Sequence, residues 1–97
     1  MRDDRFEWDD DKARTNLAKH KISFATARRI FDADNINEDL DQTMDYGEDR
    51  FRAVGLVSGR LLTVFYALRG PRRRIISARI STRTEARDYA EKFAPFR

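Results

Sequence analysis

Residues 50–81 read RFRAVGLVSGRLLTVFYALRGPRRRIISARIS, and this stretch decides the fold. Apolar, β-branched and aromatic residues recur at a period of two, which predicts strands over 51–57, 61–68 and 73–81. Ser58-Gly59 is a two-residue hairpin turn, and a second turn containing Gly-Pro spans 69–72. Strands joined by turns this short form an antiparallel meander.

A helical pattern precedes the meander. Asp9 is a good N-cap for a helix over 10–20. The apolar side of this helix is predicted to hold Ala13, Leu17 and His20. We expect that side to pack on the sheet.

Further helices and strands complete the fold. Ser23 caps a second helix that ends near residues 32–35, and residues 36–40 form a short strand. Thr82 and Glu85 form a capping box that opens a C-terminal helix. With a short extended segment at the start, the predicted order is βααβ(βββ)α. A chain of 97 residues holds one hydrophobic core, so we expect a single α+β domain over 1–97.

Charge is divided unevenly along the chain. Residues 1–49 carry 8 Lys and Arg against 14 Asp and Glu, whereas residues 50–97 carry 12 against 3. Eleven of those 12 cations are Arg, whose planar group binds phosphate and stacks on bases. This favours an RNA or DNA partner. An acidic protein partner, or arginine that only solvates a small domain, stays open on composition alone.

The composition excludes several kinds of site. The chain has no Cys and one His, which rules out disulfides, thiolate zinc sites, a thiol nucleophile and His clusters around a metal. We therefore expect no metal and no cofactor. No apolar run reaches the roughly 18 residues of a membrane span, and no signal peptide is recognisable. We expect a cytoplasmic protein with no membrane partner.

Several motifs follow one another in a fixed order. They comprise Trp8-Asp9, Lys12, Asn16, Lys19-His20, Ile22, Phe24, Ala27, Phe31, and the stretches 75–79 and 82–85. The first part resembles the signature W-D-x-x-K-x-x-x-N-x-x-K-H-x-V-x-F-x-x-A-x-x-x-F of the BrnT toxin family. The resemblance extends over nearly the whole chain.

The resemblance implies a RelE-like fold and a ribonuclease activity that arrests translation. It also implies a cognate BrnA antitoxin, a ribbon-helix-helix protein that binds and silences the toxin in a heterotetramer. Operator DNA would then be reached indirectly, through the antitoxin.

Cleavage of RNA without a metal needs a base for the 2′-hydroxyl proton, cations around the phosphorane, and an acid for the leaving oxygen. With a single His, the other proton-transfer groups are Lys, Glu and Tyr. Our candidates for catalysis are Arg79, Lys19, His20 and Glu85. Our candidates for RNA binding are Arg83, Arg60, Arg69, Arg73, Tyr66 and Trp8.

Three of the catalytic candidates have a structural alternative. Arg79 shares a predicted strand face with Ser77 and Arg73, where it clamps a phosphate or is merely solvated. His20 is a catalytic group or packs half-buried beside its helix. Glu85 is a base by its family position, or only the cap of the last helix.

The binding candidates are open in the same way. Tyr66 and Trp8 stack bases or belong to the core, and Arg83 extends the phosphate clamp or pairs with a carboxylate. Arg60 and Arg69 border the turns.

The hypothesis requires guanidinium groups around an uncovered hollow, not guanidinium groups paired with the protein's own carboxylates. Two rival functions remain: a non-catalytic module that holds RNA or DNA, and a scaffold that docks its partner and helps to repress an operon.

Overall fold

The structure is a computed structural model that describes residues 1–41 and 47–93. The elements are β1 (Phe6–Glu7), α1 (Asp10–His20), α2 (Phe24–Ala27), the 3₁₀ helix η1 (Arg28–Asp32), β2 (Ile36–Asp41), β3 (Arg50–Val57), β4 (Arg60–Arg69), β5 (Arg72–Ile80) and α3 (Arg83–Phe93). The predicted α+β class and order of elements are confirmed. The loop predicted over 41–49 lies largely outside the described residues.

The five strands form one sheet in the order β1-β5-β4-β3-β2. β2 to β5 make the predicted antiparallel meander, and Ser58 and Gly59 turn its hairpin with φ of 51° and 80°. The short extended segment predicted at the start of the chain is β1, and it pairs with β5 in parallel through Phe6 and Arg73, which makes the sheet mixed. The long segment between these two strands gives room for the crossover that parallel pairing needs.

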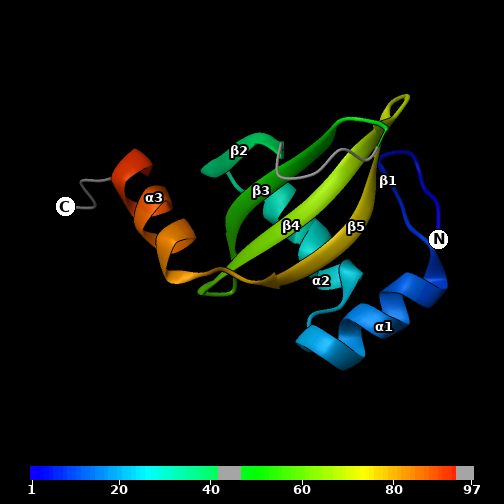
Figure 1. The fold of residues 1–97 in the computed structure, drawn as a ribbon, viewed down its shortest axis with the longest axis horizontal. Helices are drawn as coiled ribbons and strands as arrows, with labels where there is room; N and C mark the ends of the chain where they lie inside the picture. The colour runs from blue at the N-terminus through cyan, green and yellow to red at the C-terminus, as the bar shows by residue number, and fades with distance from the viewer. Residues whose placement is uncertain (42–46, 94–97) are drawn as a thin grey trace.

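α2 and the η1 turn pack on one face of the sheet, behind it in Figure 1, and α1 lies along β5 at the side of the sheet. The core lies between these two layers. It is formed by Phe6, Ile22, Phe24, Ala27, Ile30, Ala53, Val57, Leu62, Val64, Tyr66, Ile75 and Ala78. Gly55 allows η1 to approach β3 closely, because a Cβ at that position would lie 3.1 Å from the Cβ of Ile30.

The opposite face of the sheet is not covered by these helices, and we call it the open face. The side chains of β3, β4 and β5 that point to this side are Arg52, Thr63, Phe65, Ala67, Ser77 and Arg79, of which Thr63 and Ala67 are buried. α3 begins at one end of this face and extends away from it (Figure 1). The hydroxyl of Tyr89 in α3 donates to the carbonyl of Asn35 at 3.1 Å, which ties the helix to the start of β2.

A β-bulge in β5 changes which side chains share a face. Phe65 pairs with Ser77 but Tyr66 pairs with Ile75, so Ile76 is an extra residue in the strand. Strict alternation therefore fails at this point. The prediction that Arg73 lies on the same face as Ser77 and Arg79 is wrong, because Arg73 lies on the helix side of the sheet.

α1 is anchored to the sheet by a polar side chain. The Nδ2 of Asn16 donates to the carbonyls of Ala78 and Ile22 at 2.9 Å, and its Oδ1 accepts from the N–H of Ala78 at 3.1 Å. The amide thus pairs with the edge of β5 beyond β1, as a neighbouring strand would. The predicted apolar side is wrong at Leu17, which is 48% exposed, whereas Asn16 is buried.

No helix in the part of the chain that the structure describes is long and apolar enough to cross a membrane.

Candidate active site

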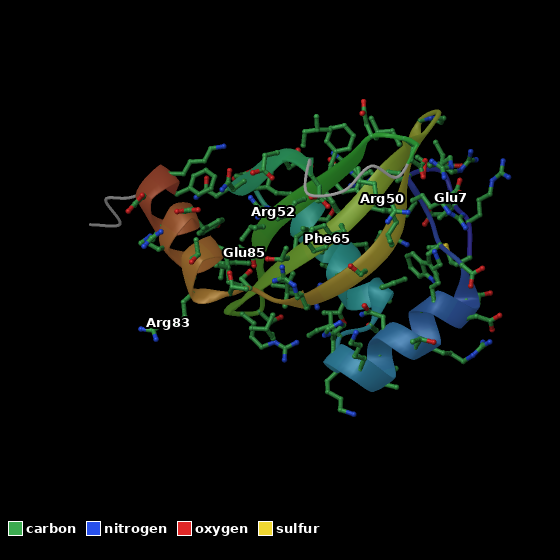
Figure 2. All side chains as sticks on the ribbon, viewed as in Figure 1. Glu7, Arg50, Arg52, Phe65, Arg83 and Glu85 are labelled. Carbon is green, nitrogen blue, oxygen red and sulfur yellow. The ribbon has the colours of Figure 1, made fainter. Side chains whose placement is uncertain are left out.

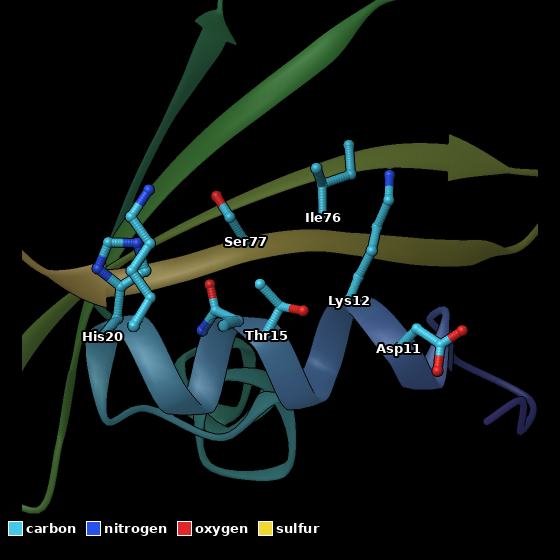
Figure 3. A pocket seen from close by; sticks show the side chains of 8 residues that line it. Asp11, Lys12, Thr15, His20, Ile76 and Ser77 are labelled. Atoms are coloured by element: carbon cyan, nitrogen blue, oxygen red, sulfur yellow. The ribbon is translucent and has the colours of Figure 1, made fainter.

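A groove of about 320 Å³ separates α1 from β5. Its α1 side is formed by Asp11, Lys12, Thr15, Asn16, Lys19 and His20, and its β5 side by Ile76 and Ser77. Figure 3 shows His20 at one end of the groove, Lys12 toward the other, and the Ser77 hydroxyl between them. The helix spacing explains the gathering, because Lys12, Thr15 and Lys19 are three and four residues apart and face the same way.

The basic side chains of this groove have no carboxylate partners within residues 1–41 and 47–93. Lys12, Lys19 and His20 form no ion pair there, and the one carboxylate of the groove, Asp11, is paired with Arg14. Lys19 and His20 also close α1, where the helix dipole stabilises positive charge. The groove therefore presents uncompensated positive charge beside two hydroxyl groups.

The arginines of the strands are arranged differently. Many of them pair with carboxylates of other elements, in the ion pairs Arg52–Asp39, Arg69–Glu48, Arg73–Glu38, Arg74–Glu7 and Arg79–Glu85. The predicted hollow lined by free guanidinium groups is therefore wrong. The acidic first half of the chain neutralises much of the basic second half.

Arg79 and Glu85 are brought together on the open face. The Nη1 and Nη2 of Arg79 donate to the two carboxylate oxygens of Glu85 at 2.7 and 3.0 Å. The hydroxyl of Thr63 donates to the same carboxylate at 2.9 Å, and Arg52 lies 3.6 Å from it. Arg79 is thus a fixed, oriented cation and not a merely solvated strand residue.

Glu85 also performs the predicted capping. Its carboxylate accepts from the N–H of Thr82 at 2.8 Å, and the hydroxyl of Thr82 accepts from the N–H of Glu85 at 3.2 Å. Burial by itself raises the pKa of Glu85, but the hydrogen bonds from Arg79, Thr82 and Thr63 outweigh it and lower that pKa to about 2. A carboxylate this acidic is a poor acceptor for a proton at neutral pH. We assign it to positioning Arg79.

This carboxylate should make the protein sensitive to acid. Because the pKa of Glu85 is about 2 when folded and near 4.5 otherwise, its stabilisation is complete at neutral pH and is lost as pH falls from about 4.5 to 2. After allowance for solvent screening, we expect the ionised Glu85 carboxylate to contribute about 2 kcal/mol to the free energy of unfolding at neutral pH. In urea unfolding, the Glu85→Gln variant should not show this loss of free energy of unfolding between about pH 4.5 and 2.

The control is Glu91→Gln, an exposed position on the same helix. The free energy of unfolding of this variant should change with pH in the same way as that of the unaltered protein. Identical pH profiles for Glu85→Gln and the unaltered protein would contradict the assignment.

Two of the RNA-binding candidates lie on the helix side of the sheet. Tyr66 is 4% exposed, and its hydroxyl donates to Glu38 at 2.7 Å. Burial, followed by this hydrogen bond, raises the pKa of Tyr66 to about 12. Arg73 lies 4.2 Å from the ring centre of Phe31 and 5.4 Å from that of Tyr66. These contacts make both residues part of the core boundary, away from Arg79.

The other binding candidates are dispersed. Trp8 packs edge-on against Phe24 at 5.7 Å, at the margin of the core. Arg60 is exposed at the start of β4, and Arg69 is paired with Glu48 at the far end of the same strand. Arg83 points away from the sheet in Figure 2. None of these four extends the Arg79 cluster within the described residues.

Our predictions from the sequence do not place Lys12 and Thr15 along the groove, or Phe65 beside Arg79. The helical spacing of Lys12 and Thr15 from Lys19 was a usable signal. Phe65 could have been placed on the face of Thr63 by alternation in β4, but its relation to Arg79 depends on the bulge in β5.

These features define a small α+β protein with a basic groove beside an open sheet face. The family model described as "Ribonuclease toxin, BrnT, of type II toxin-antitoxin system" matches residues 8–85. The chain therefore belongs to the BrnT family of ribonuclease toxins. No curated protein matches the chain. The matched segment contains the whole groove and ends at Glu85.

Proposed function

We propose that this chain is an endoribonuclease that cleaves RNA without a metal ion, at the junction of the groove and the open face. The observation that supports this proposal is the groove itself, which gathers Lys19, His20 and Ser77 from distant parts of the chain and leaves the two basic groups without carboxylate partners among the described residues. A phosphate is the anion that such a set of donors suits best.

The proposed reaction is attack of the ribose 2′-hydroxyl on the adjacent phosphate. The hydroxyl proton passes to a base, the bond to the 5′-oxygen breaks, and that oxygen takes a proton, which leaves a 2′,3′-cyclic phosphate and a 5′-hydroxyl. Lys19 and His20 are our candidates for the two proton transfers. Both side chains line the groove, at the end of α1 nearest to Ser77.

Arg79 would stabilise the phosphorane. A guanidinium group has five N–H donors. Two of those on Arg79 meet Glu85 and a third meets the carbonyl of Ile80 at 3.3 Å. The N–H of Nε and the second N–H of Nη2 have no hydrogen-bond partner among residues 1–41 and 47–93, so they are available for a phosphate oxygen.

Cleavage should be indifferent to chelators. The purified chain, incubated with labelled single-stranded RNA, should give the same fragments with and without EDTA, because protein groups supply both the charge and the proton transfers. A magnesium-dependent ribonuclease in parallel reactions provides the control for chelation. Loss of the fragments on adding EDTA would contradict the metal-independent mechanism, and RNA binding without fragments would favour the non-catalytic module.

The cellular role that we propose is arrest of translation in the cytoplasm. A toxin of a type II system is paired with an antitoxin. We propose that this antitoxin is a BrnA-like ribbon-helix-helix protein that covers the basic groove, forms a heterotetramer with the toxin and carries it to operator DNA. Co-expression of the neighbouring reading frame should abolish toxicity and yield a complex of two chains of each kind.

A further inference from the structure

One aromatic side chain of the sheet does not face the core. Phe65 lies in the middle of β4 and is flanked on the open face by Arg52 of β3 and Ser77 of β5. It is partly exposed, and Figure 2 shows it near the centre of the sheet. The other aromatic residues of β3 to β5, Phe51 and Tyr66, stack on each other at 5.4 Å on the helix side.

The surroundings of this ring are polar but electrically compensated. On one side, Arg52 makes two hydrogen bonds to Asp39, at 2.7 and 3.2 Å. On the other, the guanidinium carbon of Arg79, which is paired with Glu85, lies 5.4 Å from the ring centre. The phenyl ring is therefore an apolar surface within a frame of ion pairs.

The accessible part of this frame suits a base. The carboxylate of Asp39 is exposed, and its oxygens can accept N–H groups of a nucleobase. Both the phenyl ring and a guanidinium plane stack on bases. The uncompensated cations that suit the phosphate lie in the groove instead.

Ser77 joins the two surfaces. It is the direct neighbour of Phe65 across the β4–β5 ladder, and it also lines the groove. A nucleotide can therefore place its base on the open face while its phosphate lies beside α1.

We propose that Phe65 is the stacking platform for an unpaired nucleobase, flanked by Arg52 and Arg79, with the adjoining sugar–phosphate passing over Ser77 into the groove. The identity of the ligand as RNA rests on the proposed function. The platform itself concerns binding and does not require cleavage.

The test measures binding of a short single-stranded 2′-O-methyl RNA, which cannot undergo attack by its 2′-oxygen. A 2-aminopurine base reports stacking through quenching, and anisotropy gives the dissociation constant. Phe65→Leu should weaken binding about fivefold or more and remove the quenching, because it keeps an apolar side chain but loses the ring. Phe65→Trp should restore both.

The matched control is Phe51→Leu, the same substitution on the neighbouring strand but on the helix side. It should bind RNA as the unaltered protein does, at a temperature where thermal unfolding shows all variants folded. Duplex RNA of the same sequence should bind more weakly than the single strand.

The outcomes separate this inference from the proposed function. Phe65-dependent binding with no cleavage of ordinary RNA would support the platform and contradict the ribonuclease. Cleavage and binding that are both unchanged in Phe65→Leu would overturn the platform and leave the ribonuclease intact. Equal binding of duplex and single strand would also overturn the platform.

Discussion

Replacing Lys19 by Ala and His20 by Gln in one variant should reduce RNA cleavage by at least about a hundredfold. The two side chains line the groove from the last turn of α1 and are our candidates for the proton transfers, each of which typically contributes about 10²-fold or more. Rates of fragment formation under single-turnover conditions measure this effect. The single variants show which of the two groups carries more of it.

The control for this variant is Lys21→Asn, next along the chain. Lys21 does not line the groove, and at its φ of 62° Asn is one of the residues that the left-handed conformation tolerates best. It should retain the unaltered rate, and the double variant should unfold within about 1 kcal/mol of the unaltered protein because Lys19 is exposed. Full activity in His20→Gln would make that residue structural.

Of the substitutions proposed here, Asn16→Ala should lower the free energy of unfolding the most, by about 3 kcal/mol. The substitution removes three hydrogen bonds and leaves the buried N–H and C=O of Ala78 and the carbonyl of Ile22 without this partner. The substitution also removes the hydrogen bonds that hold α1 against β5, the two sides of the groove. The rate of RNA cleavage should therefore fall as well. Urea unfolding monitored by circular dichroism measures the free energy.

Thr15→Ala is the matched control for this change. Thr15 is exposed on the same helix turn, and its loss should change the free energy of unfolding by no more than about 0.5 kcal/mol. Equal free energies of unfolding for Asn16→Ala and Thr15→Ala would show that the hydrogen bonds between the Asn16 amide and Ala78 of β5 do not stabilise the fold.

Much of the fold follows from short-range signals. The turn at Ser58-Gly59, the N-caps Asp9 and Ser23, and the capping box of Thr82 and Glu85 all involve residues that are near neighbours in the chain. Their chemistry depends little on the rest of the molecule, so the sequence predicts them well.

The features that were missed depend on distant contacts. The bulge at Ile76 and the parallel pairing of Phe6 with Arg73 arise only when separate strands meet. Neither leaves a local pattern in the sequence. The bulge alone moves Arg73 to the side of the sheet opposite Arg79.

The charge pattern was misleading for the same reason. The excess of arginine after residue 50 suggested a basic sheet face, but Asp39 and Glu38 of β2 and Glu7 of β1 lie beside those arginines once the sheet forms. Uncompensated positive charge is instead found on α1, within the acidic half of the chain. A count along the sequence could not show which cations keep their charge accessible.

The most direct test of the account is to map messenger RNA ends in a cell-free translation reaction that receives the purified chain. We predict new ends that carry 2′,3′-cyclic phosphate, together with a fall in protein synthesis, and neither effect with the variant that lacks Lys19 and His20. The absence of new ends with the unaltered protein, or the same ends with that variant, would contradict this prediction.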